Sequence, residues 1–177
     1  MAAHVKLDMP EIELGRAGTD NAESPGYSLP VEAIIFIGVQ ATGKSSFYVE
    51  RFLDSHLRLN MDMLRTRFRE GILLRAFIEA KAKFVVDNTN PTRDERARYI
   101  EPAKKAHYRI VGYYFSSALA EAMERNAARA GRRRVPDAGV RGTYARLERP
   151  ARDEGFDELF YVRLADGGGF AVEDWTE

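Results

Sequence analysis

The residues with the clearest chemical meaning are a lysine, a serine and two glycines within residues 38–45. This segment reads GVQATGKS and fits the pattern G-x-x-x-x-G-K-[ST], with Gly38 and Gly43 at the glycine positions. In such a loop the backbone N–H groups surround a triphosphate, Lys44 reaches the outer phosphates and the Ser45 hydroxyl can ligate magnesium. An apolar run precedes the loop and a helical pattern follows it, as the motif requires. The sequence therefore predicts binding of ATP with Mg²⁺.

A second candidate is the carboxylate of Asp62, which follows a short apolar segment. Transfer of a phosphoryl group to an alcohol needs a group that accepts the hydroxyl proton and aims the oxygen, because the loose transition state depends mainly on positioning and charge neutralisation. This chemistry makes Asp62 the candidate general base. The alternative is that Asp62 only caps a helix predicted to begin at Met63.

A third candidate, Asp87, ends the apolar run at residues 84–87. In phosphate-loop proteins the acid at the end of such a strand holds magnesium directly or through water. An ATP-hydrolysing motor generally has a glutamate beside this acid, whereas the neighbour here is Asn88, which favours transfer to a bound acceptor. The alternative is that Asp87 and Asn90 only form an Asx turn before Pro91.

Arginines form a fourth candidate group. Arg125 and Arg129 lie four residues apart, on one face of a predicted helix, and residues 132–134 are three more arginines. Guanidinium groups over a migrating phosphoryl group stabilise its charge, an effect on the order of 10³-fold or more in arginine-finger systems. A lid that delivers them only onto bound ATP limits wasteful hydrolysis. We therefore predict a lid over about residues 125–147, the alternative being a solvated helical face.

Alternating strands and helices must position these groups. Predicted strands cover residues 33–37, 57–60, 84–87, 109–115 and 159–162, and predicted helices cover residues 46–53, 63–69, 72–83, 92–107, 117–130 and 140–147. Thr92 and Glu95 form a capping box at the start of one helix. This order predicts the α/β class, with a mostly parallel central sheet in a three-layer sandwich and ligands at the carboxyl ends of the strands.

Composition agrees with one such domain. The chain has 177 residues, a net charge of zero and no cysteine. Residues 1–30 are rich in Gly, Pro and acids and are predicted to be a flexible or loosely packed segment, with the domain over residues 31–177. No apolar run is long enough for a membrane span and the start lacks a signal peptide's apolar centre, so we expect a cytoplasmic protein.

Charge is distributed unevenly along the chain. Residues 93–152 hold fifteen Lys or Arg and seven Asp or Glu, whereas residues 1–32 and 153–177 are acidic. Such a local basic surplus suits the binding of phosphates on a nucleotide, a nucleic acid or both. The histidines show no metal-ligand spacing.

These motifs together resemble the 5′-kinase domain of polynucleotide kinases, phosphate-loop enzymes that transfer the γ-phosphate of ATP to a 5′-hydroxyl end. The resemblance runs over about residues 34–162. It rests on the phosphate loop, Asn60, Asp62, the stretch DNTNP at residues 87–91, Arg96-Ala97-Arg98-Tyr99, Arg125-Asn126, Arg129, residues 135–142 and Glu154-Gly155-Phe156. The DNTNP stretch is more specific than the loop alone. The fold implied is the P-loop kinase-like sandwich with an arginine-bearing helical lid.

The resemblance also implies roles for individual residues. Lys44 binds the β and γ phosphates, Asp62 is the general base, Arg129 is the lid arginine on the transferred phosphate, and Arg65 is a contact for an acceptor phosphate. The metal residues are Ser45 and Asp87. The residues around the nucleotide are Gly38, Gly43, Lys44, Ser45, Ser46, Arg125 and Arg129.

Three functions are compatible with the sequence. The first is a kinase acting on the 5′-hydroxyl of DNA or RNA, and the second is a kinase of a small alcohol, nucleoside or sugar nucleotide with the same mechanism. The third is a nucleotide-binding regulatory module. A groove lined by Arg65, Arg67, Arg93 and Arg96 favours the polymer, whereas a closed pocket favours the small molecule.

Overall fold

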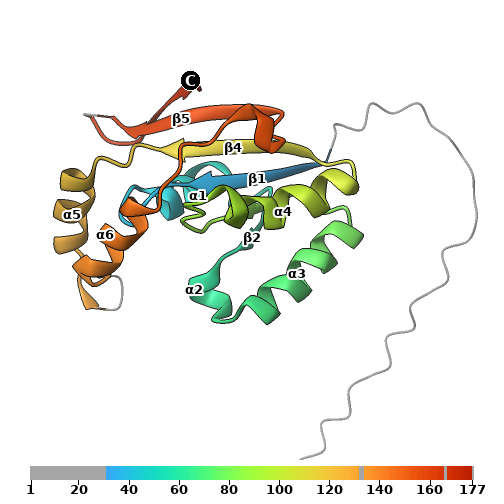
Figure 1. Cartoon of the computed structure of the whole chain (residues 1–177), viewed down its shortest axis with the longest axis horizontal. Coiled ribbons are helices and arrows are strands. Elements are labelled where there is room, and N and C mark those ends of the chain that lie inside the picture. The colour runs from blue at the N-terminus through green and yellow to red at the C-terminus, as the bar shows by residue number, and fades with distance from the viewer. Residues whose placement is uncertain (1–30, 132–133, 166, 177) are drawn as a thin grey trace, which may run out of the picture.

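The protein is described by a computed structural model, which covers residues 31–131, 134–165 and 167–176. The predicted N-terminal segment and residues 132–133 of the predicted lid lie outside this description. A six-stranded sheet in the order β2-β3-β1-β4-β5-β6 forms the centre of the molecule (Figure 1). The strands are β1 (Glu32–Ile37), β2 (Leu57–Leu59), β3 (Phe84–Val86), β4 (Arg109–Phe115), β5 (Glu158–Leu164) and β6 (Phe170–Asp174).

The sheet is parallel except at one edge. Strand β1 pairs in parallel with β3 and with β4, β2 pairs in parallel with β3, and β4 pairs in parallel with β5. Only β6 is antiparallel to its neighbour β5. The predicted α/β class and mostly parallel sheet are therefore confirmed.

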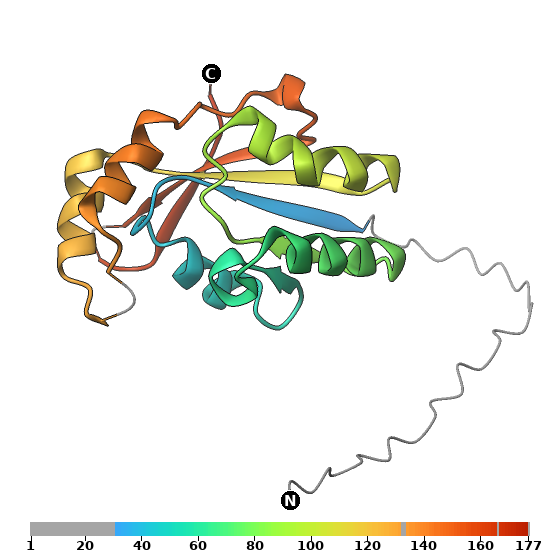
Figure 2. The same cartoon turned by 60° about the horizontal axis from the view of Figure 1, so that its bottom comes forward.

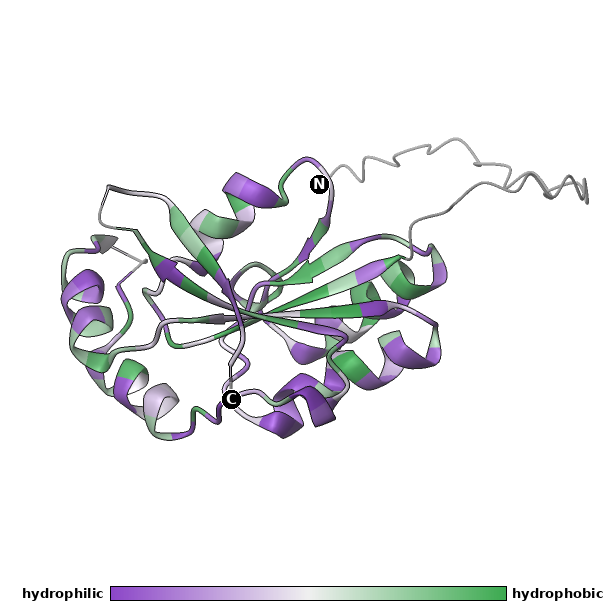
Figure 3. Cartoon of the chain, turned by 90° about the horizontal axis from the view of Figure 1, so that it is seen from above, coloured by the Kyte–Doolittle hydropathy of each residue, from purple (hydrophilic) through white to green (hydrophobic). Residues whose placement is uncertain are grey.

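Helices cover both faces of the sheet, because side chains along each strand alternate between two apolar clusters. On β1, Ala33, Ile35 and Ile37 join the cluster beneath α3 and α4, whereas Ile34 and Phe36 join the cluster beneath α1. These helices are α1 (Lys44–Arg51), α3 (Arg67–Glu79) and α4 (Arg93–Lys105). Figure 3 shows hydrophobic residues concentrated on the strands, with hydrophilic residues along the helices. The arrangement is the predicted three-layer sandwich.

Two helices pack side by side at one end of the sheet, as Figures 1 and 2 show. They are α5 (Leu119–Ala127) and α6 (Asp137–Ala145). A small apolar cluster of Val39, Ala122 and Val140 joins them to the phosphate loop. Arg125 lies in α5 and Arg129 follows it, so apolar contacts seat the helix that carries Arg125 on the loop. No helix in the described ranges is long and apolar enough to cross a membrane.

Helix starts follow the capping residues. The Thr92 hydroxyl accepts from Glu95 N at 3.2 Å, as the capping box predicts. The predicted helix from residue 63 to 69 is wrong: a short helix α2 (Met61–Leu64) ends there and α3 begins at Arg67. Thr66 is the cap that starts α3, with its hydroxyl accepting from Arg69 N at 3.3 Å.

The edge strand β6 was not predicted, because its sequence FAVED is short and acidic. Glycines at residues 168 and 169 take positive φ values of 89° and 77° and turn the chain back after β5. Phe170 of β6 then packs against Phe47 of α1, with ring centroids 5.0 Å apart. A short 3₁₀ helix η2 (Arg152–Glu154) precedes β5.

Candidate active site

The phosphate loop joins β1 to α1, and its two glycines are required by the backbone. Gly38 has φ 143°, and a Cβ there would lie 3.0 Å from Ser117 Oγ. Gly43 has φ 94°, and a Cβ there would lie 2.8 Å from a ring carbon of Phe170. Both the left-handed conformation and the close neighbours exclude a side chain. The loop therefore has the compact shape that its sequence predicts.

Lys44 lies in the first turn of α1 and is buried, with 7% of its surface exposed. Its ammonium donates to Gly38 O at 2.9 Å, to Val39 O at 2.5 Å and to Thr42 Oγ1 at 3.3 Å. All three acceptors belong to the phosphate loop. The lysine thus holds the loop closed and places its charge where a phosphate would lie.

Other predicted residues act electrostatically on Lys44. The Lys44 pKa is lowered to about 8, and burial of the ammonium is the largest cause. Asp87 raises this pKa, Arg129 lowers it and Asp62 raises it, in decreasing order of effect. Side chains from α2, from the end of β3 and from the lid are therefore near enough to this ammonium to change its pKa.

This pKa predicts how nucleotide affinity depends on pH. In the nucleotide-free protein Lys44 loses its proton near pH 8. Bound phosphates favour the ammonium and raise its pKa, so affinity is full below pH 8 and decreases as the pH rises above it. Calorimetric titration with ATP in buffers of different ionisation enthalpy should show proton uptake above pH 8, and none in Lys44→Ala. Constant affinity without proton uptake would contradict this assignment.

The predicted metal residues touch one another. Ser45 Oγ donates to Asp87 Oδ2 at 2.9 Å, and the Asp87 side chain is 2% exposed. A hydroxyl beside a carboxylate is an oxygen donor set suited to Mg²⁺, so these residues fit the ion. Arg58 of β2 binds the same Asp87 oxygen through Nε, at 3.0 Å, and through Nη2. Arg58 was not predicted, although it is the polar position of an otherwise apolar strand.

Two predicted alternatives are wrong. Asn60, not Asp62, caps α2, because its Oδ1 accepts from Met63 N at 3.2 Å. Asp62 is exposed in the first turn of that helix. The Asp87 carboxylate accepts from Ser45 and Arg58 and the Asn90 amide donates to Phe36 O at 2.7 Å, so the contacts of these side chains are long-range and not those of an Asx turn. Asp62 is therefore not used as a helix cap, whereas the Asp87 carboxylate is held by Ser45 and Arg58.

Arg125 lies on the loop side of α5. Arg125 Nε donates to Ala41 O at 2.8 Å, and Nη1 pairs with Glu121 at 3.1 Å. Arg129 follows one turn later and is half-buried, with its charge acting on Lys44. Between them, buried Asn126 exchanges two hydrogen bonds with the backbone of Val135, at 2.7 and 3.0 Å. These two bonds tie the end of α5 to Val135, which lies just before α6.

The arginines expected along an acceptor groove differ in exposure. Arg96 is fully buried, and its Nε donates to Glu154 at 2.6 Å. Arg67 pairs with Glu70, and Arg93 pairs with Asp153. Arg96 therefore cannot line a groove, because it joins the DNTNP loop to η2 within the fold.

Arg65 and Ser46 are both accessible. Arg65 is exposed with φ 70°, a conformation that non-glycine residues rarely adopt, and it directly follows α2. Ser46 is exposed in the first turn of α1, next to the loop. Both side chains are therefore accessible, and the roles of Arg65 with the acceptor and of Ser46 with the nucleotide stay predictions.

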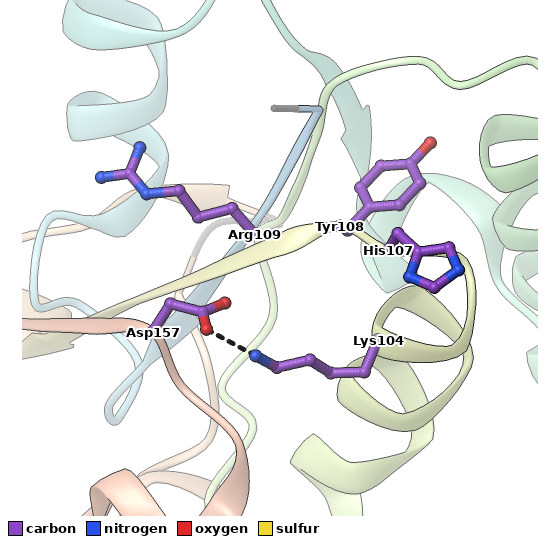
Figure 4. Close-up of a pocket in the computed structure, with 5 residues that line it drawn as sticks. All are labelled: Lys104, His107, Tyr108, Arg109 and Asp157. Carbon is purple, nitrogen blue, oxygen red and sulfur yellow. Dashed lines mark hydrogen bonds and ion pairs between the residues drawn. The ribbon is translucent and has the colours of Figure 1, made fainter. Parts of the chain in front are cut away.

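Two hollows differ in their relation to this site. A hollow of about 140 Å³ lies beside the loop, lined by Thr42, Ser116, Glu121, Arg125, Arg163 and Leu164. A larger, open hollow of about 510 Å³ lies where β4 begins, away from the loop (Figure 4). There Lys104 pairs with Asp157 at 2.6 Å, and Arg109 pairs with Glu32 and Glu158. The smaller hollow lies beside the carboxyl ends of β4 and β5, where ligands of parallel sheets bind, but Lys44, Ser45, Asp62 and Asp87 are not among the residues that line it.

The sheet order, the loop and the helical lid define the chain as a P-loop domain with a kinase-like fold. A family model described as an AAA domain matches residues 65–150, a stretch that begins after the phosphate loop. The bifunctional polynucleotide phosphatase/kinase of Schizosaccharomyces pombe is 27% identical over 135 residues, which cover 72% of this chain. The chain spans 32% of that relative's length. The predicted resemblance to polynucleotide kinases is thereby confirmed in sequence.

Solved structures confirm the fold. Kti12 of Chaetomium thermophilum, in complex with ADP-AlF3, matches with a TM-score of 0.59 and 17% identity over 76% of this chain and 90% of that one. A gluconokinase from Sinorhizobium meliloti 1021 matches with a TM-score of 0.54 and 20% identity over 76% and 83%. At these identities the likeness concerns the fold alone.

Proposed function

We propose that this chain is an ATP-dependent kinase that transfers the γ-phosphate to an alcohol, with the 5′-hydroxyl of DNA or RNA as acceptor. The observation that carries the proposal is the exposed carboxylate of Asp62, whose charge acts on Lys44 inside the phosphate loop. A protein that only binds nucleotide needs no carboxylate there. The polynucleotide phosphatase/kinase relative supports the choice of acceptor.

In the proposed reaction each side chain has one task. Asp62 accepts the proton of the acceptor hydroxyl while the oxygen of that hydroxyl bonds to the γ-phosphorus. The bond between the γ-phosphorus and the bridging oxygen of the β-phosphate breaks, which releases ADP. Lys44 turns from the loop carbonyls to the outer phosphates, and Arg129 stabilises the charge on the transferred group. A magnesium ion held by Ser45 and Asp87 would supply further neutralisation of the phosphates.

Exposed side chains after Asp62 support a nucleic acid as acceptor. Phe68 is 76% exposed and Met63 is 68% exposed, with the exposed Arg65 between them in the chain. Arg69 Nη1 reaches back to Leu64 O at 3.3 Å, so the first turn of α3 lies against the end of α2. Aromatic and arginine side chains together bind single strands by stacking on bases and by pairing with phosphates.

Replacing Phe68 with alanine is expected to raise the KM for an oligonucleotide by about 5-fold or more, because base stacking contributes about 1–3 kcal/mol. The KM for ATP and for a mononucleoside 3′-phosphate should stay unchanged. Leu53→Ala, at a 54% exposed apolar residue after α1, is the matched control. An unchanged KM for the oligonucleotide would exclude Phe68 from the acceptor surface, whereas an equal rise for the mononucleotide would place Phe68 against the first base.

The proposed function is tested by offering γ-labelled ATP and Mg²⁺ together with 5′-hydroxyl DNA and RNA oligonucleotides, mononucleosides and nucleotide sugars. Label at the 5′ end of an oligonucleotide is the expected result. Label only on a small acceptor would support the proposed mechanism but show that the substrate is a small molecule and not a nucleic acid. ATP binding without transfer to any acceptor would instead favour a regulatory module.

A further inference from the structure

The helix that carries Asp62 has little apolar packing, since Leu64 is its one side chain packed against the main apolar cluster and is only partly buried. Helix α2 is a single turn of four residues, and none of them is fully buried. A helix this short has no stability of its own. Its position, and therefore the position of the Asp62 carboxylate, depends on polar contacts with neighbouring segments in addition to the packing of Leu64.

Two asparagine side chains supply these contacts. Asn60 donates through Nδ2 to Asp87 O at 2.6 Å, while its Oδ1 accepts from Met63 N. Asn88 accepts through Oδ1 from Met61 N at 2.9 Å. Met61, before Asp62, is thus bonded to Asn88, which lies just after β3. Met63, after Asp62, is bonded to Asn60, which itself bonds to Asp87 at the end of β3. That is also where Asp87 contacts Ser45.

Buried partners fix the orientation of the Asn88 amide. Asn88 Nδ2 donates to Glu70 Oε1 at 3.0 Å and lies 3.2 Å from the Tyr99 hydroxyl. Glu70 is 5% exposed and also accepts from Arg67 at 2.7 Å and from Tyr99 at 2.8 Å. A carboxylate paired with an arginine only accepts, so the amide nitrogen must face Glu70 and the amide oxygen must face Met61.

We propose that Asn88 is a positioning residue that sets Asp62 relative to the metal residues and the phosphate loop, with Glu70 and Tyr99 fixing its orientation. The inference rests on the proposed kinase function. Phosphoryl transfer depends on placing the acceptor oxygen in line with the γ-phosphorus, and a displacement of about 1 Å can cost about 10²-fold in rate. An amide that connects two active-site segments controls such a displacement.

Asn88→Asp tests the orientation directly, because it keeps the shape and places a second carboxylate against Glu70. We expect kcat to fall by about 10- to 100-fold. The KM for ATP should change little, since Lys44 and Ser45 belong to other elements. Adding Glu70→Gln supplies a donor toward the new carboxylate and should restore most of the lost kcat, whereas Glu70→Gln alone should not raise it. Thermal unfolding of each variant separates positioning from loss of the fold.

A second readout does not depend on activity. The Met61 N–H donates to Asn88, so hydrogen exchange at Met61 should accelerate in Asn88→Ala, while exchange within β1 stays slow. Unchanged exchange at Met61, or an unchanged kcat in an active Asn88→Asp enzyme, would overturn the role proposed for Asn88 but not the proposed kinase function. Loss of kcat without rescue by Glu70→Gln, together with a lowered melting temperature, would reduce Asn88 to a structural role. A wild-type chain that transfers no phosphate would overturn the proposed function instead.

Discussion

Replacing Lys44 with alanine is expected to abolish phosphoryl transfer. The ammonium is the cation inside the phosphate loop and is already bonded to two loop carbonyls, Gly38 O and Val39 O. Removing a preorganised group that stabilises transition-state charge costs about 10²- to 10³-fold in kcat. The substitution also removes the bonds that keep the loop closed, so the affinity for ATP should fall as well.

The measurement is label transfer from γ-labelled ATP, with ATP binding followed separately by calorimetry. Lys105→Ala is the matched control, because Lys105 is an exposed lysine in the last turn of α4. Lys44→Arg keeps the charge but places a planar guanidinium in a buried site, and we expect it to be nearly as inactive. Normal transfer by Lys44→Ala would remove the phosphate loop from the chemistry and with it the proposed mechanism.

The parts of the site that can be predicted from the sequence are those whose residues are adjacent in the chain. The phosphate loop needs glycines where φ is positive, and an apolar strand must precede it, so its pattern is local. Asp87 is likewise marked by the apolar run that it ends. Both features depend on neighbouring residues only, and the structure places them in contact at 2.9 Å through Ser45.

The parts that were missed depend on contacts between distant segments. Arg58 and Asp87 are 29 residues apart, and Asn88 and Glu70 are 18 apart, so these pairs form only once the strand order is set. The same reason explains the error at Arg96. Its basic side chain suggests an exposed phosphate contact, whereas its partner Glu154, 58 residues away, buries it in an ion pair.

Replacing Asp62 with asparagine is expected to separate catalysis from nucleotide binding. The substitution keeps the size of the side chain but removes the group that accepts the acceptor's proton, a contribution of about 10²- to 10⁴-fold. Asp62 is exposed on α2, whereas the bonds that hold Lys44 all come from the phosphate loop. We therefore expect kcat to fall within this range and the Kd for ATP with Mg²⁺ to stay close to that of the wild type.

Asp94→Asn is the matched control, because Asp94 is also an exposed acid in the first turn of a helix, α4. It should retain full transfer, which separates the role of Asp62 from a general effect of a negative charge at a helix start. Single-turnover label transfer reports the chemical step, and calorimetry reports ATP binding. Loss of ATP binding in Asp62→Asn would place this residue in the nucleotide site or the fold. Full activity of Asp62→Asn would show that Asp62 is not the general base. A different carboxylate at the same edge of the sheet would then have to accept the proton of the acceptor.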